Sequence, residues 1–176
     1  MSENIGQQII VDNRTGAAGV IGADFVAKSP PNGYTIMATT SGHTILPHLQ
    51  KLPWDPIKDF APVTALVVYQ LLLSVHPSVP ATSLQELISL AKAKPGALNY
   101  GTGGGGTPPH LAMELLKSMA GVDIVHVPYK GNALVTAALL SGEIQVSLDT
   151  MIGPLRGVRA GRLRGLAVSG KKRSVI

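Results

Sequence analysis

The chain has 176 residues, of which 45% are hydrophobic and 14% charged, a composition typical of a folded globular protein. It contains no cysteine, which excludes disulfides, thiolate metal ligands and cysteine nucleophiles. The formal net charge of +5 arises mainly from a run between residues 156 and 173 that has no acidic and no aromatic residue, so we expect no nucleic-acid partner. The longest apolar run, residues 66–75, is about half of a bilayer span, and we expect no membrane-spanning helix.

The first half of the chain predicts a strand, a helix and a second strand. Residues 7–13 form an apolar run with β-branched residues, which is typical of a strand. Residues 14–29 predict a glycine-bearing loop that leads into a helix, and residues 34–40 predict the next strand. Because the connections are short, this order predicts two parallel strands of an α/β sheet. The proline-broken residues 41–60 leave room for one or two short helices.

The second half predicts strands and helices in regular alternation. Residues 61–79 predict one or two buried strands, and residues 82–96 predict a helix that begins at Thr82 or Ser83 and ends at Pro95-Gly96. The remaining predicted elements are strands over 97–101, 122–129, 144–150 and 163–170, and helices over 107–121, 131–143 and 152–162.

The segment GTGGGGT, residues 101–107, joins a predicted strand to a predicted helix and is the main candidate for a ligand site. It satisfies G-x-G-x-x-G formally, but no acidic residue ends the following strand and Pro108-Pro109 removes two amide donors. A P-loop would need a lysine after Gly106, where the chain has Thr107. A more general anion site fits better, because glycine amides, a helix N-terminus and the Thr102 and Thr107 hydroxyls supply donors. The alternative is a loop that binds nothing.

Polar side chains also follow two other predicted strands. Ser41 and His43 come after residues 34–40, at the edge where open α/β sheets bind ligands. A hydrolase would use such a Ser–His pair, but no nucleophile elbow surrounds Ser41. Asp149 ends the strand predicted over 144–150 and either lines a cleft or caps the next helix. The histidines show no metal-ligand spacing, and we expect no metal and no cofactor.

Four segments, taken in their order along the chain, resemble those of a known protein family: VDNRTGAAGVIGADF at 11–25, ALNYGTGGGGTPPHLAMELL at 97–116, VDIVHVPYKG at 122–131 and SGEIQVSLDT at 141–150. Together they resemble the periplasmic substrate-binding receptors of tripartite tricarboxylate transporters, called Bug receptors. The resemblance implies an α/β fold like that of type II periplasmic binding proteins, with parts of two lobes and a cleft between them. Residues 1–75 would form a partial first lobe without its first strand–helix unit, and residues 76–176 the second lobe with part of the return crossover.

The resemblance further implies a non-catalytic receptor that captures a small carboxylate or dicarboxylate in the periplasm for membrane permease subunits. The ligand-binding residues that it implies, together with the candidates above, are Ser41, Gly42, His43, Thr102, Gly103, Gly104, Gly105, Gly106, Thr107 and Asp149. Compared with the family, the chain looks truncated at both ends, and residues 1–10 match neither a signal peptide nor the other carboxylate-binding loop. The alternatives are a small α/β enzyme that binds a nucleotide or anion at the glycine loop, and a fragment that no longer binds ligand and self-associates.

Overall fold

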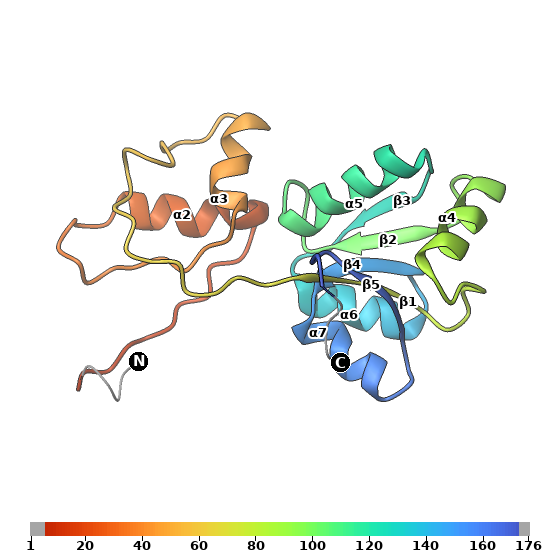
Figure 1. The fold of residues 1–176 in the computed structure, drawn as a ribbon. Helices are drawn as coiled ribbons and strands as arrows, with labels where there is room; N and C mark the ends of the chain where they lie inside the picture. The colour runs from red at the N-terminus through yellow and green to blue at the C-terminus, as the bar shows by residue number, and fades with distance from the viewer. Residues whose placement is uncertain (1–5, 173–176) are drawn as a thin grey trace.

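The computed structural model describes residues 6–172 and shows two units joined by one extended segment (Figure 1). The N-terminal unit comprises residues 6–60, the connecting segment residues 61–70, and the C-terminal unit residues 71–172. Arg173, the last residue of the basic run, lies outside the described residues. No helix in the described part of the chain is long and apolar enough to cross a membrane.

The C-terminal unit is built on a five-stranded mixed sheet with the strand order β3-β2-β4-β1-β5. β2 pairs in parallel with β3 and β4, whereas β1 pairs antiparallel with β4 and β5. As a result, β2, β3 and β4 all end at the same edge of the sheet, where open α/β sheets bind ligands. The strands are β1 (Leu71–Val75), β2 (Asn99–Thr102), β3 (Val125–Pro128), β4 (Val146–Thr150) and β5 (Arg164–Val168).

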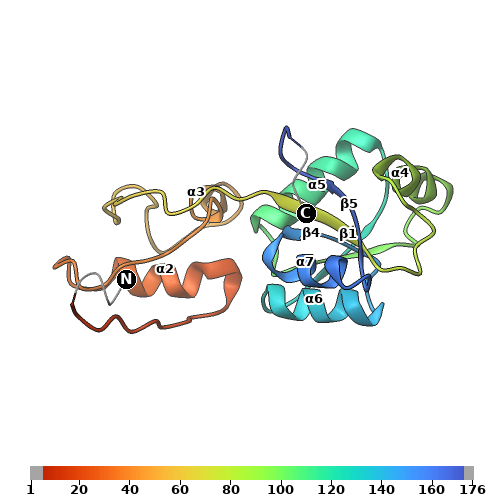
Figure 2. The same cartoon turned by 60° about the horizontal axis from the view of Figure 1, so that its bottom comes forward.

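Helices cover both faces of this sheet (Figures 1 and 2). On one face, α4 (Leu84–Ala93) and α5 (Pro108–Ala120) bury Leu87, Ala91 and Met113 against the strands. On the other face, α6 (Asn132–Ser141) and α7 (Ile152–Arg159) enclose a second cluster that includes Val135 and Leu139. Burial of two separate apolar clusters makes this unit a self-contained three-layer domain.

The structure confirms the helices and strands predicted in the second half. Their sequence signals are local. The Ser83 hydroxyl accepts a hydrogen bond from the Glu86 amide at 3.2 Å and begins α4 as an N-cap. Pro108 occupies the first turn of α5, and Gly121 ends that helix in the left-handed conformation, with φ of 62°. Residues of these types fix helix ends without help from tertiary contacts.

The N-terminal unit differs from its prediction, since residues 6–70 of the described chain contain no strand. The unit consists of the short 3-10 helix η1 (Ala17–Gly19), α2 (Val20–Ala27), α3 (Gly42–Ile45), the 3-10 helix η2 (Leu46–His48) and extended loops. The two strands predicted over 7–13 and 34–40 are wrong, because neither segment forms a strand in the described chain. Ile10 is 84% exposed and Ile36 60% exposed, so the apolar pattern that favoured strands is not buried in this chain. A strand needs hydrogen-bonding partners that the pattern alone does not supply.

The domain boundary predicted after residue 75 separates β1 from the strands with which it pairs. β1 contacts β4 from Leu71↔Thr150 to Val75↔Val146 and contacts β5 on its other side, so it lies in the sheet of the C-terminal unit. The apolar run over 66–75 predicts a buried strand but carries no information on which sheet that strand joins. Only its second half is buried, whereas Val67 and Val68 in the connecting segment are 72% and 94% exposed.

Candidate functional site

The glycine loop, residues 102–107, leads from β2 into α5 and faces the N-terminal unit (Figure 1). Gly104 has φ of 138° and Gly106 has φ of 76°, values that side-chain-bearing residues rarely adopt. A Cβ atom at Gly106 would lie 2.9 Å from Leu46 Cδ2, and one at Gly104 would lie 3.9 Å from Ala18 Cβ. Glycine therefore suits the backbone turn at both positions, and at Gly106 it also allows the close approach of the two units.

Hydrogen bonds divide the amides of this loop into two groups. The Gly104 amide donates to Thr102 Oγ1 at 3.3 Å, and the Gly106 amide donates to His110 Nδ1 at 3.1 Å. Among the described residues, the amides of Gly103, Gly105 and Thr107 have no acceptor. The loop thus presents three donors for a ligand while two internal bonds hold its shape.

The two threonine hydroxyls, predicted as ligand donors, are used within the loop. Thr102 Oγ1 donates to the Gly104 carbonyl at 3.1 Å, and Thr107 Oγ1 donates to the same oxygen at 2.8 Å. Thr102 is 1% exposed and lies beneath the loop rather than at its surface. Both side chains therefore stabilise the turn around Gly104.

A second loop, Arg14–Gly19, faces the glycine loop from the N-terminal unit and leads into α2. Its backbone turns through consecutive positive φ values: 126° at Gly16, 45° at Ala17, 54° at Ala18 and 97° at Gly19. Alanine in the left-handed region costs of order 1–2 kcal/mol, so the surroundings must impose this conformation.

Between the two loops lies a cavity of about 430 Å³. This volume lies within the range of small-molecule sites. The lining includes two cationic residues, Arg14 and Lys130, and no acidic residue. The lining residues are Arg14, Thr15, Gly16, Ala17, Ala18, Gly19, Gln50, Gly103, Gly104, Gly105, Thr107, Tyr129, Lys130 and Gly131.

Three helices begin at this cavity, and each contributes to its positive potential. α2 follows Gly19, α5 follows Thr107 and α6 follows Gly131, and all three of these residues line the cavity. A helix N-terminus carries a partial positive charge and unpaired amides, which favour an anion. Lys130 and Arg14, which also forms an ion pair with Asp12 at 2.7 Å, add positive charge, so the cavity is suited to a small anion.

Of the predicted site residues, Gly103, Gly104, Gly105 and Thr107 line the cavity, whereas Gly106 lies buried beneath Leu46. The segment Ser41–His43 begins α3, outside the cavity lining. Its Gly42 lies close to the start of α5, since a Cβ there would be 3.6 Å from Pro108 Cδ.

His43 is part of an aromatic cluster within the N-terminal unit. Its ring stacks on Trp54 with 4.9 Å between centroids and meets the edge of Phe60 at 4.6 Å. Its Nε2 atom lies 3.1 Å from the Pro56 carbonyl. These contacts connect α3 to the loop over residues 54–60 and account for the position of the imidazole without a ligand.

Asp149 lies at the end of β4, is 2% exposed and does not line the cavity. Its Oδ1 atom accepts hydrogen bonds from Asn132 Nδ2 at 2.8 Å and from the Thr150 amide at 2.6 Å. Burial raises the pKa of this carboxyl above its ordinary value, because desolvation outweighs the Thr150 hydrogen bonds that lower it. Asp149 thus links the end of β4 to Asn132, the first residue of α6, which follows the cavity-lining Gly131.

Several cavity residues were missed by sequence reasoning. The sequence predicts Arg14 and residues 15–19 only as a loop before a helix, Tyr129 only as the end of a strand and Gly131 only as the start of the next helix. The available signal was the arrangement of glycines and one cation immediately before a helix, repeated at both places. Nothing in the sequence indicates that the two segments face each other across two units.

The described residues contain no group of three or more His, Cys, Asp or Glu that could hold a metal ion.

A family model described as "Tripartite tricarboxylate transporter family receptor" matches residues 1–176. The UPF0065 protein in the gbd 5' region of Cupriavidus necator is 40% identical over 174 residues, a match that covers 98% of this chain and 53% of that protein. Protein BugT of Bordetella pertussis is 33% identical over 177 residues, with 99% of this chain and 54% of that protein covered. The chain therefore spans about half the length of the curated relatives that it matches.

Solved structures agree in fold. Rpa4515 of R. palustris, solved with adipate, has a TM-score of 0.94 at 40% identity and covers 98% of this chain and 58% of its own. The periplasmic binding protein BugD has a TM-score of 0.92 at 27% identity, with 98% and 58% covered. MatC from Rhodopseudomonas palustris, solved with bound malate, has a TM-score of 0.89 at 27% identity, with 98% and 59% covered.

These likenesses confirm the predicted fold class, an α/β fold of the periplasmic-binding-protein type, and the predicted resemblance to Bug receptors. The expectation that the chain is not an enzyme is confirmed at the level of its family, which is one of transporter receptors. The chain belongs to the tripartite tricarboxylate transporter receptor family.

Proposed function

We propose that the chain contributes the binding site for a small carboxylate, held in the cavity between residues 14–19 and the glycine loop. The observation that carries the proposal is the lining of this cavity, which has two cations, the starts of three helices and no acidic side chain. The amides of Gly103, Gly105 and Thr107 would bind carboxylate oxygens, with Arg14 and Lys130 supplying charge.

The ligand class is a small dicarboxylate. Two related proteins were solved with adipate and with malate, which carry a carboxylate at each end. In this chain, cations lie in both units, since Arg14 precedes α2 and Lys130 precedes α6. A ligand with two separated negative charges would contact both units at once and favour the arrangement in which they approach each other.

The transport role follows from the family and is a proposal for this chain. A receptor of this kind would act in the periplasm and deliver its ligand to membrane permease subunits. The family description and the likeness to the periplasmic binding protein BugD support this proposal.

Isothermal titration calorimetry with adipate, malate, succinate and citrate tests binding directly. We expect at least one dicarboxylate to bind and Lys130→Gln to weaken its binding about three- to tenfold, or about 0.7–1.4 kcal/mol. Lys92→Gln is the matched control, because Lys92 lies in the last turn of α4, outside the cavity lining. Equal affinity in both variants, or no heat with any of these ligands, would reject the proposal.

Self-association is a second candidate behaviour, favoured by exposed apolar side chains in the N-terminal unit and the connecting segment. Ile10, Val11, Tyr34, Val63, Val67 and Val68 are each more than 70% exposed. Exposed apolar side chains gathered in this way favour contact with other chains. Sedimentation at increasing protein concentration separates a monomer from a dimer, and a monomer at all concentrations would exclude this behaviour.

A further inference from the structure

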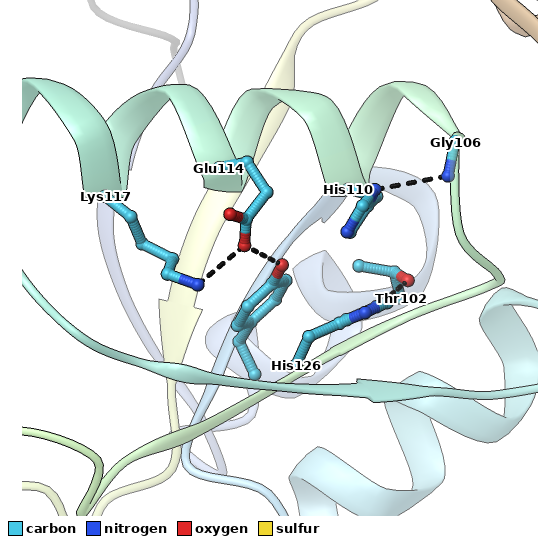
Figure 3. Close-up of polar contacts among 7 residues, drawn as sticks. Thr102, Gly106, His110, Glu114, Lys117 and His126 are labelled. Carbon is cyan, nitrogen blue, oxygen red and sulfur yellow. Dashed lines mark hydrogen bonds and ion pairs between the residues drawn. The ribbon is translucent and has the colours of Figure 1, made fainter. Parts of the chain in front are cut away.

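Two histidines lie directly beneath the glycine loop, and one of them holds it (Figure 3). His110, in the first turn of α5, accepts a hydrogen bond from the Gly106 amide through Nδ1 at 3.1 Å. An imidazole nitrogen can accept only when it carries no proton. This bond therefore requires neutral His110 with its proton on Nε2.

The neighbouring His126, on β3, is connected to the other bond that shapes the loop. Its Nε2 atom lies 2.7 Å from Thr102 Oγ1. The single hydroxyl proton of Thr102 is donated to the Gly104 carbonyl, so His126 Nε2 must be the donor to Thr102 Oγ1. Thr102 Oγ1 then accepts from His126 and from the Gly104 amide, which uses its hydrogen-bonding capacity fully.

The two imidazoles interact with each other. Their ring centroids are 4.3 Å apart, and His126 also stacks on Tyr100 at 4.9 Å. At this separation a charge on one ring disfavours a charge on the other. The two protonations are thus coupled, and a proton on one ring makes protonation of the other less favourable.

The other charged and titratable groups of this cluster come from α5 and β2. Glu114 Oε1 accepts hydrogen bonds from Tyr100 Oη at 2.6 Å and from Lys117 Nζ at 2.7 Å. Burial lowers the pKa of His126, and the His110 and Lys117 charges lower it further, with Glu114 opposing them. His126 is consequently held neutral, and its uncharged ring packs beside His110 at neutral pH.

We propose that His110 and His126 are positioning residues of the glycine loop, and that His110 holds the loop in its ligand-binding shape only while its imidazole is neutral, so that acidification releases the loop. When His110 takes up a proton at Nδ1, its new N–H and the Gly106 amide become two donors facing each other. The Gly106–Thr107 backbone must then move, and with it the Thr107 amide that faces the cavity. The consequence for binding rests on the proposed function, whereas the consequence for the loop does not.

The first test needs no ligand. In ¹⁵N–¹H spectra recorded from pH 8.0 to 5.0, the Gly106 amide of the parent chain should shift with a midpoint that matches the His110 ring signals. His110→Asn places a non-titrating acceptor near the position of Nδ1 and should remove this pH dependence. His76→Asn is the matched control, because His76 Nδ1 also accepts a backbone amide, that of Ser78 at 3.2 Å, in the turn after β1. A Gly106 amide that does not follow the His110 titration would overturn the inference.

The second test measures adipate affinity of the same variants across the same pH range. In the parent and in His76→Asn, affinity should fall by up to about tenfold per pH unit once His110 takes up a proton. His110→Asn should lose this dependence, while any protonation of adipate itself affects all variants equally. The same slope in His110→Asn as in the parent would contradict the role of His110. If no variant binds adipate at pH 8.0, the proposed ligand fails, and the Gly106 titration still decides the inference.

Discussion

Gly106 and Leu46 are in direct contact across the two units, because a Cβ atom at Gly106 would lie only 2.9 Å from Leu46 Cδ2. The same Cβ would lie 3.1 Å from Leu49 Cδ1, so the end of the glycine loop fits against η2 as well as against the start of α5. The loop that presents amides to the cavity is therefore also a surface on which the two units meet.

Gly106→Ala should destabilise this chain by about 1–3 kcal/mol. The substituted residue would have to keep φ of 76°, in the left-handed region, and its methyl group would collide with Leu46. Chemical denaturation measures the loss. Gly105→Ala is the control, since a Cβ there meets no atom within 4 Å and should change stability by less than about 0.5 kcal/mol. Equal effects of the two substitutions would contradict the observed packing.

Asp149→Asn should stabilise the chain at neutral pH. The pKa of Asp149 is raised in the folded state by burial, so the folded chain binds a proton more readily than the unfolded chain. Its contribution is therefore most favourable below the ordinary pKa of about 3.9 and declines as pH rises through the folded pKa. Asparagine keeps an oxygen for the bonds from Asn132 and Thr150 and removes the buried charge.

Thermal unfolding of both chains at pH 4 and pH 7 checks this sign. The difference between Asp149→Asn and the parent should be larger at pH 7 than at pH 4. Asp123→Asn serves as the control because Asp123 is exposed. A larger gain at pH 4 than at pH 7 would mean that the Asp149 carboxylate is stabilised by its surroundings rather than destabilised.

Tyr100→Phe should cost about 0.5–1.5 kcal/mol of stability. Tyr100 is fully buried, and its hydroxyl donates to Glu114 Oε1 at 2.6 Å. The substitution removes one of two donors to this carboxylate, while Lys117 Nζ remains 2.7 Å away. Urea denaturation provides the measurement, and Tyr34→Phe, at a side chain that is 92% exposed, should be nearly neutral.

Ser83→Ala should destabilise α4 by about 0.5–2 kcal/mol, because the Ser83 hydroxyl accepts the Glu86 amide at the start of the helix. Ser89→Ala, in the interior of the same helix, replaces serine with a better helix former and should not destabilise it. Chemical denaturation of the two variants should therefore give a lower free energy of unfolding for Ser83→Ala than for Ser89→Ala, with a difference of at least about 0.5 kcal/mol.

The sequence was sufficient for the helices and strands of the C-terminal unit from α4 onward, because their signals are local, but it did not assign β1 to this unit. Ser83, Pro108 and Gly121 each act within one turn of a helix, and the strands between them alternate with helices at short spacing. The strands predicted over 7–13 and 34–40 failed because a strand depends on partners that local patterns do not reveal.

The sequence predicts the glycine loop as one part of the candidate site, but not the residues that face it. The glycine loop is contiguous, so its glycines and its position before a helix were evident from the sequence. Arg14 and Lys130 face the same cavity from segments more than 100 residues apart, and only the fold brings them together. His43 was predicted at the cleft because it follows an apolar segment; its ring contacts Trp54 and Phe60, and it is not among the residues that line the cavity.

The most direct test of the account is to map the binding of adipate on the amides of this chain by ¹⁵N–¹H spectroscopy. We expect the largest shifts at Gly103, Gly105 and Thr107 and in the turn over residues 16–19, which line the cavity from both units. Shifts confined to Ser41–His43, or spread over the surface without the glycine loop, would contradict a carboxylate site between the two loops.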